Sequence, residues 1–413
     1  MTSIADLPPE TVEDILLHCQ PRCVAALAQT CRAFRDLVYL SPDNHIWRNL
    51  YLAQPFDDPR KCITRLGRPR GEANWREELQ AAIHAEAVLA KPSAYSSEEI
   101  CTTLRTLLHM AHNVPPWSIH RSFVEDEVSE NLLWVAAQLQ VSGGAILNSP
   151  QEGGEIEQLR NRLHTYFGLS RLSGDLEPAA RVVSRAYVYS MGRYRAENMY
   201  GPFIAGDGEK VNWTHIRAIH HVVSMHIVPI DEDEEREYFI YPLSMPFIQN
   251  VLNVGEDLDG LVDWAGVEGS WFCSFCFCDH RDLLEFNSTS VLPEDLSIFE
   301  NPDFHEVFRT LQFQVHVTHT VQDDLHPTRP VIHFAGTLGI PSTATMTGYV
   351  RMTPEDEVRW HFVSGEPGNL IWSSEGVQIG GVRSQFGVLG TWTTVFHDND
   401  DPIGPFWLRR KLE

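Results

Sequence analysis

The spacing of apolar residues changes along this chain, and this change constrains the fold more than any other feature. In the first half, apolar residues recur every three or four positions, as in the run from Trp75 to Ala90. In the last third they alternate with period two, so that Val358, Trp360 and Phe362 share one face of an expected strand. Such segments recur about eight times. The sequence therefore predicts an α+β protein with helices first and an antiparallel β domain last.

The β domain is expected to protect the edges of its sheet. A meander of short strands does this by closing into a barrel or by folding into a two-layer sandwich, and we expect the barrel. Gly269-Ser270-Trp271 resembles the opening of lipocalin-like (calycin) barrels, which implies the same architecture. The glycine-rich stretch from Gly376 to Val382 is read as part of a further strand, because it lies among strands and has no helix or lysine after it for a phosphate loop.

The stretch from Leu7 to Tyr51 carries the most specific pattern. Pro8 and Pro9 favour a helix start, and Val12, Ile15 and Leu16 place apolar side chains on one stripe. A second stripe with a break near Thr30 and a final apolar pair follow, which together indicate three short helices. Because these helices carry more apolar surface than they can bury among themselves, a partner surface is plausible.

This stretch resembles an F-box. It has the Leu-Pro-x-Glu opening, the Ile-Leu pair, the Leu-x-x-x-Cys-x-x-Phe centre and the closing Trp. The resemblance implies a non-catalytic module that docks on the Skp adaptor, and through it on a cullin, in a cullin-RING ubiquitin ligase. An ordinary helical subdomain without a partner is the alternative. The positions carried over as docking or motif-core residues are Leu7, Pro8, Ile15, Leu16, Leu27, Cys31 and Trp47.

Four segments are expected along the chain. Residues 1–55 form the F-box, 56–170 a helical linker domain, 171–260 a mixed helix and loop region, and 261–413 the β domain. In the mixed region, residues from Arg181 to Tyr200 fit a helix or a strand equally well. Residues 348–410, 186–189 and 198–203 resemble a group of fungal, chiefly basidiomycete, F-box proteins. That resemblance implies this architecture but no particular target.

The charge and the apolar runs exclude several classes of protein. The chain has 32 Lys and Arg against 56 Asp and Glu, a net charge of −24, which argues against nucleic-acid binding. No run of about 18 apolar residues occurs, so no membrane partner is expected. With its few cysteines it is expected to be an intracellular protein with reduced thiols, cytoplasmic and/or nuclear.

Metal, cofactor and catalytic sites are not expected. The stretch from Cys273 to His280 holds four possible zinc ligands, but Cys276 and Cys278 face away from Cys273 in a strand, and buried thiols are favoured. The histidines between His215 and His226 include no His-x-x-x-His pair. The chain also lacks the nucleophile elbow, the phosphate loop, the dinucleotide fingerprint and the metalloprotease motif. An enzyme with an appended F-box is therefore the least favoured hypothesis.

Tryptophans and arginines of the β domain are the candidates for a target or ligand pocket. Trp and Arg are frequent anchors at interfaces, and at the open end of a barrel they could hold a peptide segment or its terminal carboxylate. Core packing is the alternative for each tryptophan. The candidates are Trp271, Arg351, Trp360, Trp372, Arg383 and Trp392.

The sequence as a whole favours a substrate-recognition subunit of an SCF-type ligase. It would dock on the Skp adaptor through the F-box and bind an unknown protein substrate through the β domain. The alternative is a small-ligand-binding barrel protein whose F-box acts outside a ubiquitin ligase.

Overall fold

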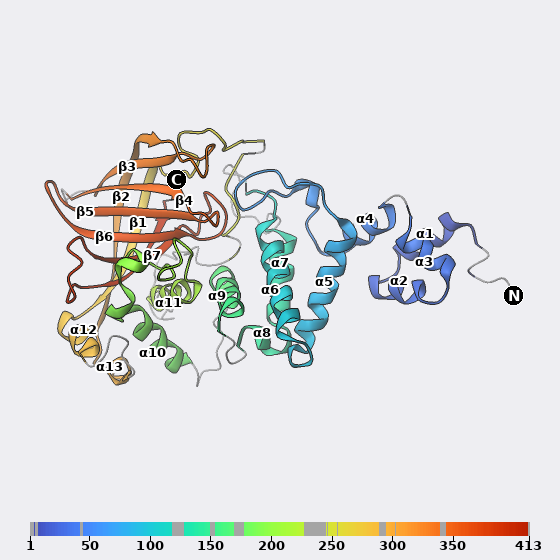
Figure 1. Ribbon diagram of the computed structural model, residues 1–413, viewed down its shortest axis with the longest axis horizontal. Helices are drawn as coiled ribbons and strands as arrows, with labels where there is room; N and C mark the ends of the chain where they lie inside the picture. Colours follow the sequence, from blue (N-terminus) through green and yellow to red (C-terminus); the bar gives the residue numbers. More distant parts are fainter. Residues whose placement is uncertain are drawn as a thin grey trace, which may run out of the picture. The chain divides into compact units, whose positions relative to one another are not determined.

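Two compact units make up the chain. The computed structural model describes residues 4, 7–41, 44–117, 128–148, 153–168, 177–226, 245, 247–253, 255–288, 295–301, 303–338 and 344–411. The first unit comprises residues 1–64, 69–115 and 123–151, and the second comprises 65–68, 116–122 and 152–413. Figure 1 shows that the first is helical and that the second combines helices with a sheet, which confirms the α+β prediction.

Four short helices open the first unit, where the sequence indicated three. They are α1 (Pro9–Leu17), α2 (Pro21–Ala28), α3 (Arg32–Tyr39) and α4 (His45–Leu52). The expected break near Thr30 separates α2 from α3, because Cys31 is extended and the Thr30 hydroxyl donates to the Leu27 carbonyl at 2.7 Å. Pro9 and Pro21 stand at the first positions of α1 and α2, where a preset φ favours the helix.

The helical runs expected after the F-box are also present in the first unit. They are α5 (Trp75–Ala90), α6 (Ser97–His112) and α7 (Glu130–Leu139), followed by α8 (Ala145–Asn148). Ser96 and Glu99 form a capping box at the start of α6. The buried carboxylate of Asp57 accepts hydrogen bonds from the Ser129 hydroxyl and from the amide of Asn131. It thereby fixes the start of α7 against the segment after α4.

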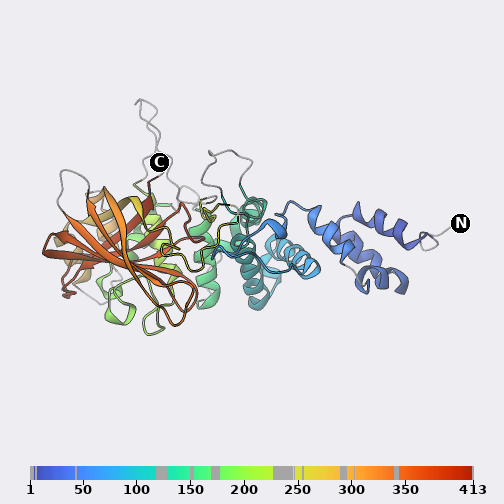
Figure 2. The same cartoon turned by 90° about the horizontal axis from the view of Figure 1, so that it is seen from above.

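A closed barrel of eight antiparallel strands dominates the second unit, as predicted. Each strand pairs with the next, and β8 pairs with β1. Figure 2 shows these strands in yellow to dark red. The strands are β1 (Gly269–Cys278), β2 (Glu306–Val321), β3 (Val331–Leu338), β4 (Thr345–Met352), β5 (Val358–Glu366), β6 (Asn369–Gln378), β7 (Val388–Thr394) and β8 (Gly404–Arg410).

The period-two alternation places every second side chain inside the barrel. Val358, Trp360 and Phe362 are buried on the inner face of β5, as the sequence indicated. Gly376 and Gly390 are cross-strand partners on β6 and β7. A Cβ atom at either position would lie within 2.8 Å of the Phe406 ring, so both glycines make room for that ring.

The strand expected from Gly376 to Val382 ends earlier, at Gln378. Gly380 has φ of +84°, and a Cβ atom there would lie 2.5 Å from the Ile248 carbonyl oxygen. The chain turns at this point because the segment around Ile248 packs against it: the Gly381 amide donates to the Ile248 carbonyl at 2.8 Å. The glycines therefore serve a close backbone approach instead of a longer strand.

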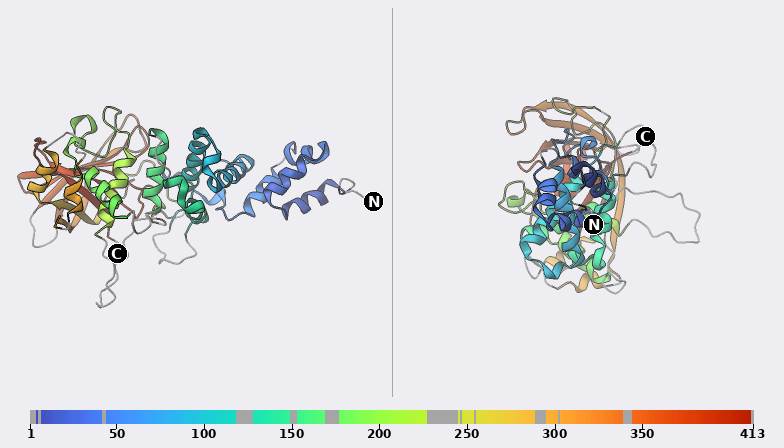
Figure 3. Two further views of the ribbon diagram at one scale, coloured as in Figure 1. Left: turned by 90° about the horizontal axis from the view of Figure 1, so that it is seen from below. Right: turned by 90° about the vertical axis from the view of Figure 1, so that its right-hand side faces the viewer.

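Helices pack on the outside of the barrel (Figure 3). They are α9 (Glu155–Phe167), α10 (Glu177–Val188), α11 (Trp213–Ser224), α12 (His280–Asn287) and α13 (Ser297–Glu300). The ambiguous run after Arg181 is helical in its first part, as the end of α10. The buried carboxylate of Glu306 on β2 accepts hydrogen bonds from Arg185 and Tyr189 and lies 2.8 Å from the His226 ring nitrogen.

Candidate functional site

The residues assigned to the F-box divide into buried and accessible groups. Leu16 is only 2% exposed and Trp47 is buried, with its indole nitrogen donating to the Val38 carbonyl at 2.8 Å. Leu27 is half-buried. Leu7, Pro8, Ile15 and Cys31 are exposed. Leu16 and Trp47 therefore hold the helices together, whereas the exposed residues are available to a partner.

Within the stretch assigned to the F-box, sequence reasoning missed one strongly exposed apolar residue. Leu40 follows α3 directly and is 71% exposed. One feature of the sequence could have indicated this exposure. Leu40 stands at the end of a helical stripe, directly before the run from Ser41 to Asn44, a position that usually carries a polar side chain. Together with Ile15, which is 38% exposed, Leu40 gives the F-box region accessible apolar surface.

Two of the candidate tryptophans pack inside the barrel. Trp271 and Trp360 are buried, and their rings meet edge to face at 5.1 Å. The Trp271 indole nitrogen donates to the Val267 carbonyl at 2.8 Å, and Phe334 packs on Trp360. These two residues form core.

Trp372 and Trp392 line a cavity near the other end of the barrel interior. Their rings meet edge to face at 5.3 Å, and Trp372 is 38% exposed. The cavity, here called the aromatic cavity, has a volume of about 530 Å³. Its rings belong to Phe275, Phe277, Phe313, Phe362, Trp372, Trp392 and Phe406. A pocket of this size and composition is typical of sites for small apolar groups.

Polar groups of the aromatic cavity are few. Ser364 and Ser374 lie on the inner faces of β5 and β6, and Asp279 and His280 also line the cavity, at the start of α12. The imidazole of His280 lies 2.8 Å from the Asp400 carbonyl oxygen. Burial raises the pKa of the Cys273 thiol, also in the lining, to about 12, so this sulfur stays protonated and apolar.

The two candidate arginines do not line the aromatic cavity. Arg351 pairs with Glu209, which also pairs with Arg359 on the outer face of β5. Arg383 has φ of +60° and donates to the Glu256 carboxylate at 2.7 Å and to the Asp263 carbonyl at 2.6 Å. Of the six candidates, the structure thus brings only Trp372 and Trp392 together at this cavity.

The cysteines and histidines considered for metal binding are spread out. Cys273 faces the barrel interior, whereas Cys276 and Cys278 are buried on the opposite face of β1, as the sequence indicated. Burial lowers the pKa of His215 to about 3, and this ring packs between Tyr187 and Tyr194. Within the described residues, no group of three or more His, Cys, Asp or Glu side chains is arranged to hold a metal ion.

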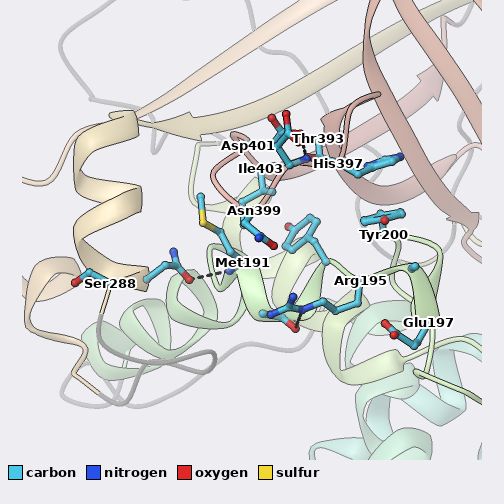
Figure 4. A pocket seen from close by; sticks show the side chains of 15 residues that line it. Met191, Arg195, Glu197, Tyr200, Ser288, Thr393, His397, Asn399, Asp401 and Ile403 are labelled. Atoms are coloured by element: carbon cyan, nitrogen blue, oxygen red, sulfur yellow. Dashed lines mark hydrogen bonds between the residues drawn. The ribbon is translucent and has the colours of Figure 1, made fainter.

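A second concavity, here called the polar pocket, lies beside the barrel (Figure 4). Its volume is about 610 Å³. The rings of Tyr200 and His397 stack in it with centroids 3.6 Å apart, and both residues have positive φ. Asp401 accepts hydrogen bonds there from the Thr394 hydroxyl and the Asp398 amide. No motif in the sequence pointed to this pocket, because its residues come from segments about 200 positions apart.

Comparison with known proteins adds one family. No curated protein and no solved structure matches the chain, so the resemblances to a fungal group and to lipocalin-like barrels stay predictions. No helix in the described part of the chain is long and apolar enough to cross a membrane. The family model described as F-box-like matches residues 4–53, so this part of the chain is an F-box-like domain.

Proposed function

We propose that this protein is a substrate-recognition subunit of an SCF-type cullin-RING ubiquitin ligase. The match of residues 4–53 to the F-box-like family carries the proposal. F-box domains typically belong to non-catalytic substrate receptors, which bring a target to the ligase. In this role the chain docks on the Skp adaptor and through it on a cullin, and it works in the cytoplasm, the nucleus or both.

The accessible apolar residues of the F-box-like domain support the docking step. Ile15 and Leu40 expose large aliphatic side chains, while their neighbours Leu16 and Val38 are buried. Covering exposed apolar surface contributes about 25 cal/mol per Å² to association. A partner that covers Leu7, Ile15 and Leu40 therefore gains free energy without disturbing the helix core.

The target is proposed to bind the barrel unit, at the opening of the aromatic cavity. Trp372 lines this cavity and is partly exposed there. An exposed aromatic ring at a cavity is a typical anchor of a protein interface. Ubiquitin transfer then follows from proximity, because the target is held at high effective concentration near the catalytic subunits.

The experiment that tests this function is capture of purified Skp adaptor and cullin by the full chain. Wild type is expected to retain both and Ile15→Glu neither. A carboxylate buried in an apolar interface loses its hydration and gains no hydrogen bond in return, which costs binding free energy. Val183→Glu, at an exposed aliphatic site on α10 of the second unit, is the control and is expected to capture both. Failure of folded wild type to capture the adaptor would overturn the proposal.

One observation favours a second function. The aromatic cavity suits a small ligand, so the barrel could carry one while the F-box-like domain acts outside a ligase. Co-purification of an aromatic small molecule with a chain that captures the Skp adaptor but no cullin would support this alternative.

A further inference from the structure

We infer that the aromatic cavity binds an uncharged aromatic group whose polar atom forms a hydrogen bond with Ser374. The group belongs either to a free small molecule or to a side chain of the target. Only the second source rests on the proposed function, since a free molecule requires nothing of the F-box-like domain.

The shape and walls of the cavity select an aromatic group. Seven aromatic rings from six strands surround a volume of about 530 Å³. Trp392 is held in place by its indole nitrogen, which donates to the Cys276 carbonyl at 3.3 Å, and by edge contacts with Phe275 and Trp372. A flat ring entering this space gains offset and edge contacts beyond simple burial of its area.

The charges around the cavity disfavour an anion. Its lining contains no Lys or Arg among the described residues. The carboxylate in the lining belongs to Asp279, which pairs with the Arg281 guanidinium at 3.3 Å and therefore adds little net charge. An anionic ligand would lose its hydration in an apolar space whose described lining offers no Lys or Arg to compensate.

Ser374 supplies an unused hydrogen-bonding group inside the cavity. Its side chain is on the inner face of β6, opposite Phe362 and Trp392, and the residue is only 5% exposed. No hydrogen bond joins its hydroxyl to another described residue. The hydroxyl is not among the fully buried unpaired polar atoms of the described residues, so it keeps accessible surface in the cavity, where a ligand atom that donates or accepts gains a hydrogen bond.

A matched pair of dyes tests the proposed charge preference on the full chain. N-phenyl-1-naphthylamine is neutral, and 8-anilinonaphthalene-1-sulfonate carries the same rings with an added sulfonate. We expect the neutral dye to bind at least about tenfold more tightly and to receive fluorescence energy from Trp372 and Trp392. Equal or tighter binding of the sulfonate, or no binding of the neutral dye to the folded protein, overturns the inference.

Two variants locate the dye. Ser364→Phe places a ring into the cavity, whereas Val363→Phe places the same ring on the outer face of β5. Ser364→Phe is expected to weaken binding of the neutral dye by at least about tenfold, and Val363→Phe to leave it within about twofold. Circular dichroism checks that both fold. Wild-type affinity in folded Ser364→Phe would place the dye elsewhere and overturn the inference.

A competition experiment distinguishes the two sources of the aromatic group. Displacement of the neutral dye by N-acetyl-tryptophanamide assigns the site to an aromatic side chain of a target, whereas displacement by 2-naphthol alone assigns it to a free molecule. If neither compound displaces the dye, the inferred specificity is wrong. Capture of the Skp adaptor is measured separately. If the dye experiments fail while the adaptor is still captured, the inference about the cavity is wrong and the proposed ligase function stands.

Discussion

The F-box-like domain and the barrel differ in where they hold unused apolar surface. The F-box-like helices bury Leu16 and Trp47 but leave Ile15 and Leu40 in solvent, so their unused apolar surface faces outward. The barrel also encloses unused apolar surface, around the aromatic cavity, while Trp372 and Phe396 remain accessible. An outward surface suits a protein partner that covers it, whereas an enclosed space suits a single group that enters it.

The substitution with the largest expected effect tests whether the barrel unit can be destabilised without affecting the F-box-like domain. Glu306→Ala leaves Arg185, Tyr189 and His226 without their shared carboxylate. Breaking a buried charged network of this kind costs about 3–5 kcal/mol. Urea unfolding followed by tryptophan fluorescence should show this loss, whereas capture of the Skp adaptor should persist. The exposed Glu285→Ala is the control, and an equal loss there would contradict the assignment.

A pair of neighbouring substitutions separates core from docking surface within the F-box-like domain. Leu16→Ala removes a buried side chain and is expected to cost about 2–5 kcal/mol of unfolding free energy. Ile15→Glu alters an exposed one and should change that free energy by about 0.5 kcal/mol or less while capture is lost. Thermal melts monitored by circular dichroism measure both. If Ile15→Glu melts as early as Leu16→Ala, then Ile15 is a packing residue.

Acid is expected to destabilise the barrel unit through His215. Burial, with a smaller contribution from Arg193, lowers its pKa from 6.5 to about 3 in the folded state. The unfolded chain therefore binds more protons between these two pH values, and the stabilisation present above pH 6.5 is lost as the pH falls. The contribution approaches about 1.4 kcal/mol per pH unit in this window.

The variant His215→Phe isolates this pH effect. Unfolding free energies of wild type and variant, measured by urea titration across the window, should converge or cross as the pH falls, because only the wild type loses this contribution. The exposed His305→Phe should keep the wild-type slope. A wild-type slope in His215→Phe would show that this ring is protonated in the folded protein.

The smallest expected effect concerns one hydrogen bond in the aromatic cavity. Ser374→Ala should weaken binding of 2-naphthol about fivefold, the equivalent of about 1 kcal/mol, and should leave 2-methylnaphthalene unaffected. Ser373→Ala, on the outer face of the same strand, should change neither affinity. Equal weakening of both compounds by Ser374→Ala would point to altered packing instead of a lost hydrogen bond. Fluorescence titration measures the affinity of each variant for each of the two compounds.

The same contrast explains what the sequence could predict. The F-box pattern is local, since Leu7, Ile15 and Leu16 lie within ten residues, so a single stretch revealed it. The barrel followed from alternation, because a meander of strands must protect its edges. Both predictions used short-range information.

The environment of the candidate site depends on pairs far apart in sequence. Arg351 pairs with Glu209 and Arg383 with Glu256, at separations of 142 and 127 residues. The sequence around either arginine therefore gave no sign that its guanidinium is already paired with a carboxylate. Likewise, Ser364 and Ser374 face the same cavity as Trp392 only because of the register of β5, β6 and β7. Alternation shows that a residue points inward, but not which residues it meets there.

The most direct test is calorimetric titration of purified Skp adaptor into the full chain. We predict one-to-one binding to wild type and no binding heat with Ile15→Glu, while both proteins bind N-phenyl-1-naphthylamine with the same affinity. That result would show that the exposed F-box surface docks on the adaptor independently of the barrel. Binding of the adaptor to Ile15→Glu with wild-type affinity, or no binding to wild type, would contradict the account.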